Sequence, residues 1–291
     1  MKRLTAILFG IALAANAAAE DVNRTLDASS DGHVHISNIS GSVSVDGWSR
    51  DQVEVTGKIG PKVEELIFER SGDKITIKVK VPRKSGRGIE SDLYIRVPEA
   101  SSIDVGTVSA DIDVTGVRGE QKLEAVSGDI ETECDDADVT AGTVSGDVIM
   151  RGNGKDAQTH SASVSGDVDL YKLAGDVFAE SVSGDLFIED GSFDRASFNV
   201  VNGDVVFRSE LRSGGKLKAE TVNGEVSLDF DGDVSGQFDI DTFNGDIENC
   251  FGPKPQRTSK YAPGMELSFS EGDGDARVTV STVNGDISIC K

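Results

Sequence analysis

Histidine and serine side chains could give this chain acid–base, nucleophilic or metal chemistry. The histidines are His33, His35 and His160. A serine recurs directly before glycine, as in Ser145-Gly146, but the Gly-x-Ser-x-Gly spacing of a nucleophile elbow is absent. His33 and His35 would share one face of a strand, yet no carboxylate or cysteine is spaced to complete a metal site with them. We therefore predict no catalytic residue, no metal ligand and no cofactor.

Aspartates are the other candidate ion ligands, because calcium prefers oxygen. Residues 229–233 begin like an EF-hand loop, but Val234 stands where that loop needs glycine and Ile240 where it needs glutamate. The nine-residue calcium β-roll repeat is absent too. We expect the recurring aspartates to accept hydrogen bonds from local turn amides instead. They are Asp129, Asp147, Asp167, Asp185 and Asp204.

A four-residue unit, apolar–Ser/Asn–Gly–Asp/Glu, positions these aspartates. From position 110 to Gly245 its third residues follow one another at a nearly constant step, and the last step, to Gly285, is two such periods. A fixed period of roughly 20 residues is typical of a solenoid. Apolar and polar residues alternate around each unit, as in half-buried strands. The second residues of the unit are Ser127, Ser145, Ser165, Ser183, Asn202, Asn223, Asn244 and Asn284.

Two all-β architectures fit this repeat. A meander of hairpins is one, because Asn-Gly between apolar alternations is a strong hairpin signal. A parallel β-solenoid (β-helix) with coils of about 20 residues is the other, and it stacks identical side chains about 4.8 Å apart. The block of serines followed by a block of asparagines favours the solenoid, in which these residues form a turn ladder and each bonds its neighbours above and below.

The cysteines agree with stacked coils. Cys250 and Cys290 each follow a glycine of the unit by five residues, so in neighbouring coils their Cα atoms would lie at disulfide separation. We predict a Cys250–Cys290 bond that locks the C-terminal coil. Cys134 is out of phase, and we expect it to be reduced and buried.

The chain divides into three parts. Residues 1–19 have the features of a signal peptide, namely Lys2 and Arg3, an apolar run of about a dozen residues and three alanines before the cleavage site. Residues 20–100 follow the repeat poorly and would form a strand-rich N-terminal cap, and residues 101–291 would form the solenoid. We predict export to the periplasm, the cell surface or the medium, with no transmembrane segment in the mature chain.

The charge limits the partners. Residues 101–250 hold 10 Lys and Arg against 32 Asp and Glu, so this segment carries the whole net charge of −22. Such a body repels nucleic acid and anionic lipid head groups. Two basic loops, residues 83–87 and 254–260, stand out against it, and we expect them to be solvated. The partner we predict is an unidentified envelope polymer or protein.

The phased VSGD and VNGD units, the early SGSVSVDGW segment and the late FGPKPQRTSKYAPG and STVNGDISI segments resemble a bacterial putative-adhesin family of unknown function. The resemblance covers nearly all of the mature chain and implies an exported or envelope-associated β-solenoid with no established activity. Ala110 and Glu225 depart from the motif. We predict a non-enzymatic scaffold or adhesin-like binding protein. The alternatives are a polysaccharide-binding or polysaccharide-active β-helix and a calcium-stabilised module.

Overall fold

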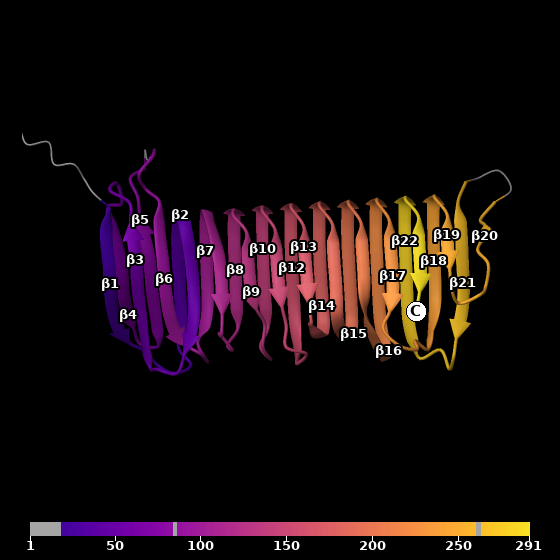
Figure 1. Ribbon diagram of the computed structural model, residues 1–291, viewed down its shortest axis with the longest axis horizontal. Helices are drawn as coiled ribbons and strands as arrows, with labels where there is room; N and C mark the ends of the chain where they lie inside the picture. The colour runs from indigo at the N-terminus through magenta and orange to yellow at the C-terminus, as the bar shows by residue number, and fades with distance from the viewer. Residues whose placement is uncertain (1–18, 84–85, 260–262) are drawn as a thin grey trace, which may run out of the picture.

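The protein is all-β in every part that the structure describes. The computed structural model describes residues 19–83, 86–259 and 263–291, which form 23 strands and no helix, joined in one hydrogen-bonded sheet. The strands lie side by side along the length of an elongated molecule (Figure 1). The predicted signal segment up to residue 18, residues 84–85 and residues 260–262 lie outside the described residues.

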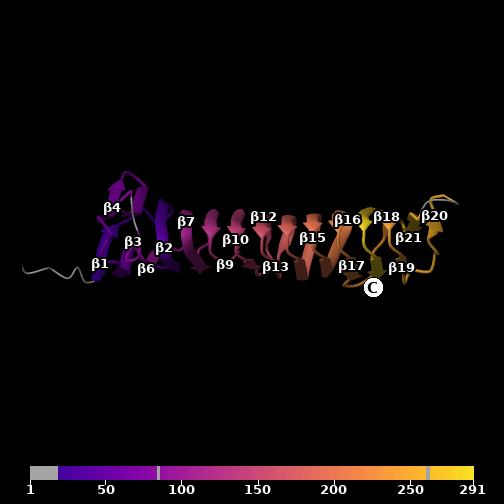
Figure 2. The ribbon, with the colours of Figure 1, turned by 90° about the horizontal axis from the view of Figure 1, so that it is seen from above.

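The central strands form two layers (Figure 2), because each glycine unit carries the chain from one layer to the other. Ser145 pairs in parallel register with both Ser127 and Ser165, which belong to neighbouring repeats. Among the central strands, those on either side of a glycine unit either do not pair with each other or, like β15 and β16, pair in parallel, so the hairpin meander is wrong. The central strands are β7 (Ser102–Thr115), β8 (Gln121–Ser127), β9 (Ile130–Glu133), β10 (Val139–Ser145), β11 (Val148–Arg151), β12 (Asp156–Ser165), β13 (Val168–Tyr171), β14 (Ala174–Ser183), β15 (Leu186–Asn202), β16 (Val205–Asn223) and β17 (Val226–Phe230).

The core lies between the two layers. Leu123 of β8 and Ile130 of β9 are fully buried, and within each strand buried and exposed residues alternate up to the corner, as the period of a strand requires. Towards the C-terminal end phenylalanines fill this space. Phe207 contacts Phe198 and Phe230 at ring-centroid distances of 6.0 and 5.7 Å. These phenylalanines thus remove a large apolar surface from water.

The N-terminal end joins the stack through one long strand. β2 pairs in parallel with β7 and places Ser40 on Ser109 and Gly41 on Ala110. The early Ser-Gly copy is therefore a member of the stack, although several strands separate it from its partner along the sequence. Antiparallel pairs then cover this end, β1 with β3, β3 with β6 and β4 with β5. The bounds are β1 (Glu20–Asp27), β2 (His33–Trp48), β3 (Gln52–Ile59), β4 (Glu65–Ser71), β5 (Lys74–Lys80) and β6 (Ser91–Pro98).

The C-terminal end has an unexpected strand order. β22 lies between β16 and β18, and β23 lies between β17 and β19 (Figure 1). Asn284 therefore separates Asn223 from Asn244, whereas the order along the sequence places Asn244 next to Asn223. β21 pairs antiparallel with β18 and covers this end. The bounds are β18 (Gly236–Asn244), β19 (Ile247–Asn249), β20 (Gln256–Arg257), β21 (Met265–Glu271), β22 (Ala276–Asn284) and β23 (Ile287–Cys290).

Candidate binding groove along the exposed valines

The apolar residue of each repeat unit faces solvent. In β8 the alternation buries Leu123 and Ala125, so Val126 points outward together with Glu124. The valines at this position are 42–48% exposed, a large share for an apolar side chain. We call these residues, with the half-buried Ile39 of β2, the valine row: Ile39, Val108, Val126, Val144, Val164, Val182, Val201, Val222 and Val283.

A groove of about 1060 Å³ runs beside the valine row from β2 to β22. Its second wall is formed by the residues two positions before each valine, and small residues such as Gly142 and Ala162 leave room there. The sequence pattern did not lead us to predict this groove. The signal that could have revealed it is the apolar pair Ala125-Val126, because two adjacent residues of a strand cannot both face the core.

The serine and threonine hydroxyls on the floor of the groove already donate hydrogen bonds within the protein. Thr143 donates to the carbonyl oxygen of Gly128 at 3.1 Å, and Ser163 donates to that of Gly146 at 3.0 Å. The same contact to a glycine carbonyl recurs in other coils, made by Ser181, Thr221, Thr242 and Thr282. These hydroxyls satisfy carbonyls at the corners, so the floor offers few free donors to a ligand.

Three glutamates of the second wall give the groove negative charge. Glu124 and Glu220 have ion partners in Lys122 and Lys218, at 2.9 and 2.8 Å. Glu180 accepts a hydrogen bond from the side chain of Asn199 and has no cationic partner among the described residues. Its charge is therefore available to an occupant of the groove.

The asparagines of the turn ladder are bonded to one another. Asn223 donates to Asn202 and Asn284 donates to Asn223, each at 2.8 Å, and Asn244 donates to Asn284 at 2.9 Å. The serines behave differently. Within the described ranges no hydrogen bond joins their exposed hydroxyls, which are aligned only through the pairing of their strands. Ser163 and Ser181 on the floor of the groove, by contrast, do donate hydrogen bonds between coils. The exposed serines are Ser127, Ser145, Ser165 and Ser183.

The recurring aspartates bond the coil that follows. Oδ1 of Asp129 accepts the backbone N–H of Asp147 at 2.9 Å, and Oδ1 of Asp147 accepts that of Asp167 at 2.9 Å. Each aspartate carboxylate thus bonds a neighbouring coil rather than the backbone of its own turn. Our expectation of a hydrogen bond within the turn is therefore wrong. In the parts of the chain that the structure describes, no group of three or more His, Cys, Asp or Glu residues could hold a metal ion.

Substitutions at Asp167 test this inter-coil bond. Oδ1 of Asp167 accepts the part-buried N–H of Asp185 at 2.8 Å. Asp167→Ala leaves that donor unpaired and should lower the free energy of unfolding by about 1–3 kcal/mol. Asp167→Asn keeps an oxygen acceptor and should unfold close to wild type in urea. Equal losses in the two variants would show that the hydrogen bond contributes nothing.

The histidines and the free cysteine are separately placed. His33 contacts the Ser102 hydroxyl at 3.1 Å and His35 contacts the Asp104 carboxylate at 2.9 Å, both across the β2–β7 pair. His160 is exposed in β12. Cys134 is free and buried, and burial raises the pKa of its thiol to about 12, so it stays protonated and unreactive.

Crowded carboxylates should make stability depend on pH. Burial, followed by neighbouring carboxylates, raises the pKa of Asp113, Asp169 and Asp241 above the ordinary 3.8. The folded state therefore binds protons more tightly than the unfolded chain, and the cost of ionising these groups disappears as the pH falls through their raised values. We expect the thermal midpoint to rise as the pH falls from 7 towards 3.8.

Further acidification should reverse the trend. Hydrogen bonds from Lys155 and Arg212 lower the pKa of Asp135 and Asp156, respectively. Above pH 3.8 these two carboxylates stabilise the fold. That stabilisation is lost as the pH falls through their lowered pKa values. Asp113→Asn should flatten the rise that the wild-type midpoint shows above pH 3.8, as measured by thermal melts. A midpoint that falls steadily from pH 7 would contradict the raised pKa values.

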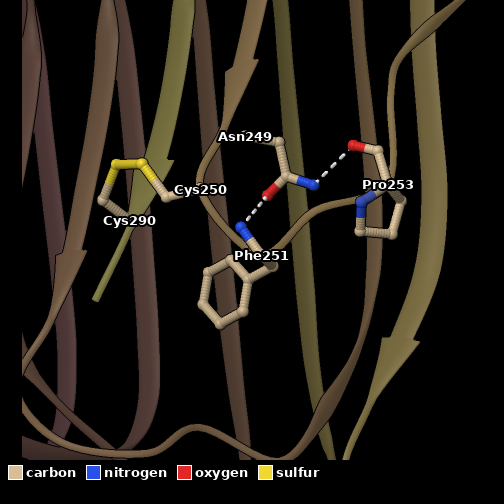
Figure 3. The surroundings of a disulfide bond; sticks show 5 residues. All are labelled: Asn249, Cys250, Phe251, Pro253 and Cys290. Carbon is tan, nitrogen blue, oxygen red and sulfur yellow. Dashed lines mark hydrogen bonds between the residues drawn. A yellow bond between two sulfur atoms is a disulfide. The ribbon is translucent and has the colours of Figure 1, made fainter.

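The predicted disulfide is present. Cys250 and Cys290 are bonded with their Cα atoms 4.9 Å apart, and Asn249 beside them bonds Phe251 and Pro253 (Figure 3). The bond joins adjacent coils, because Cys290 ends β23 and Cys250 follows β19. It therefore clamps the inserted C-terminal coil to the coil outside it.

None of the described residues form a helix with the length and apolar character to cross a membrane.

Comparisons with known proteins agree with this architecture. The profile of the Toastrack DUF4097 family matches residues 25–179 and 178–290. No curated protein matches the chain significantly. A solved structure from Parabacteroides distasonis ATCC 8503, described as a putative lipid binding protein, is 13% identical with a TM-score of 0.56, over 94% of this chain and 98% of that one. A putative adhesin from Bacteroides fragilis NCTC 9343 is 12% identical with a TM-score of 0.47, over 92% and 96%. The first likeness concerns the fold alone.

Proposed function

The chain belongs to the Toastrack DUF4097 family, and we propose that it is a non-enzymatic, adhesin-like binding protein of the cell envelope. In this proposal the chain is exported, residues 20–100 cap a β-solenoid, and the solenoid is a rigid scaffold that recognises an elongated polymer or protein. The parallel, in-register pairing from β7 to β17 supports the solenoid. The disulfide is in keeping with an oxidising compartment.

The groove along the valine row is the observation that carries the binding function. Monomeric proteins seldom expose long continuous apolar strips, and those that do commonly use them for binding. The valines contribute little to the core at 42–48% exposure, and alternation alone does not require an apolar residue at an outward position. Their repetition over nine coils is explained by a ligand that extends along the stack.

The same groove weighs against a polysaccharide ligand. Sugars present many hydroxyl groups that need hydrogen-bond partners, and an unmet partner is costly once it is buried. The floor hydroxyls already donate to glycine carbonyls, as Thr143 does to Gly128. Among the described residues that line the groove there is also no aromatic side chain on which a sugar ring could stack.

Site-directed photo-crosslinking in the native envelope tests the proposal. A photoreactive residue is placed at Val182 in the groove or at Phe178, which is 38% exposed in the same strand but does not line the groove. We expect a discrete product from position 182 and none from position 178. Identical products from both positions, or none from either, would overturn a binding role for the groove.

A further inference from the structure

The dimensions of the groove restrict its occupant. The valine row has nine members, so at about 4.8 Å per coil the groove is roughly 38 Å long. This length suits an extended occupant that lies along the valine row and is much longer than a compact small ligand needs.

The lining favours an apolar chain over a polar one. The valine row forms one wall, and floor hydroxyls such as that of Ser163 are bonded to corner carbonyls. A peptide would need partners for its N–H and C=O groups, which this floor does not supply. An alkyl chain needs none and gains from burial of its methylenes. An extended alkyl chain gains roughly 1.3 Å of length per methylene, from a C–C bond of about 1.5 Å. The groove is therefore longer than an extended alkyl chain of about 16 carbons.

The charge around the groove selects the head group. Glu180 lacks a cationic partner among the described residues, and an aspartate such as Asp167 or Asp185 follows each of the central valines by three residues in the sequence. An anionic head group would meet repulsion along the whole stack, and a cationic one would be attracted. Resting on the proposed binding function, we propose that the groove binds the alkyl chain of a cationic amphiphile along the valine row.

A second copy of the chain fits the groove less well. Two copies that met through their valine rows would bring the glutamates of one second wall close to the acidic flank of the other. The net charge of −22 adds to this repulsion. Self-association through the groove is therefore an outcome that the test must detect.

The experiment is calorimetric titration of the full mature chain with alkyltrimethylammonium ions of 8, 12 and 16 carbons, below their micellar concentrations. A methylene that is half buried should raise affinity about two-fold, so affinity should climb steeply with chain length. Alkyl sulfates of equal length should bind at least ten-fold more weakly. Val182→Lys should reduce binding at least ten-fold, and Phe178→Lys, which adds the same charge in the same strand, should not.

Several results would overturn the inference. Binding that is independent of chain length, or equal in the two lysine variants, would indicate general attraction of cations to an acidic protein. Tighter binding of sulfates would refute the head-group assignment. A dimer in analytical ultracentrifugation that Val182→Lys dissociates would make a second copy the occupant. Val164→Lys repeats the test if Val182→Lys does not fold. A groove-specific crosslink to a protein without alkyl binding would leave the proposed function standing and remove only the alkyl ligand.

Discussion

Gly146→Ala is expected to lower the free energy of unfolding by roughly 3 kcal/mol. A Cβ atom on Gly146 would collide with the carbonyl group of Gly128 in the preceding coil, lying 2.7 Å from its carbon, and would lie 2.9 Å from Oδ1 of Asp129. The φ of +152° adds backbone strain for any L side chain. The backbone at Gly128 cannot move away without breaking inter-coil hydrogen bonds such as that between Asp129 and Asp147. The clash therefore cannot be relieved by a small structural shift.

Gly142→Ala is the matched control, in the strand that leads to the same corner. Its Cβ would meet only the carbonyl oxygen of Ala162 at 3.8 Å, an ordinary contact. Because glycine in a strand costs conformational entropy, this variant should be neutral or more stable by about 0.4–1 kcal/mol. Urea unfolding of both variants is the measurement. If Gly146→Ala matched Gly142→Ala, the corners could not be stacked as closely as the structure has them.

One repeat has alanine, Ala110, at the glycine position, and the corner formed by β2 and β7 explains why. Ala110 occupies the glycine position in β7 and stacks on Gly41 of β2. Both strands run unbroken through this corner, whereas the chain leaves strand geometry at Gly128 and Asp129 between β8 and β9. A smoother corner leaves room for a Cβ. We therefore expect the alanine penalty to be largest at corners with a tight turn on both neighbouring coils.

The local regularities of the fold were predictable from the sequence because they repeat. The spacing of the glycine units reappears as the offset between paired strands, for example Ser127 on Ser145 and Ser183 on Asn202. The matching phase of Cys250 and Cys290 was sufficient to predict their bond. A repeat carries this information because stacking requires equivalent residues at equivalent places.

The order of the last coils could not be predicted in the same way. Asn244 follows Asn223 by one ordinary period of the repeat, which fits direct stacking as well as any other step. The chain instead leaves a gap that β22 fills, and only the pairing of β22 with both β16 and β18 shows it. The groove was missed for a different reason. Periodicity identifies inward positions, and it is silent on what an outward valine contacts.

Removal of the disulfide is expected to destabilise the C-terminal end by about 2–4 kcal/mol. The bond closes a loop with a sequence separation of 40, for which chain entropy gives about 4 kcal/mol. The paired substitution Cys250→Ser and Cys290→Ser avoids leaving a single reactive thiol. Urea unfolding measures the loss, and reduction of the wild-type protein should reproduce it, because Cys134 is buried and forms no disulfide.

Removal of the disulfide should first destabilise the C-terminal end and leave the central strands folded. Among the described strands, β18 reaches the stack only through β22, since its other partner is the covering strand β21. Once the clamp between β23 and the residues after β19 is removed, the outer coil and β21 can detach together while β8 to β16 stay paired. Hydrogen exchange should therefore accelerate in residues 236–249 and 265–271 and remain slow in residues 121–223. Uniform acceleration along the chain would contradict a terminal unit held in place by the inserted coil.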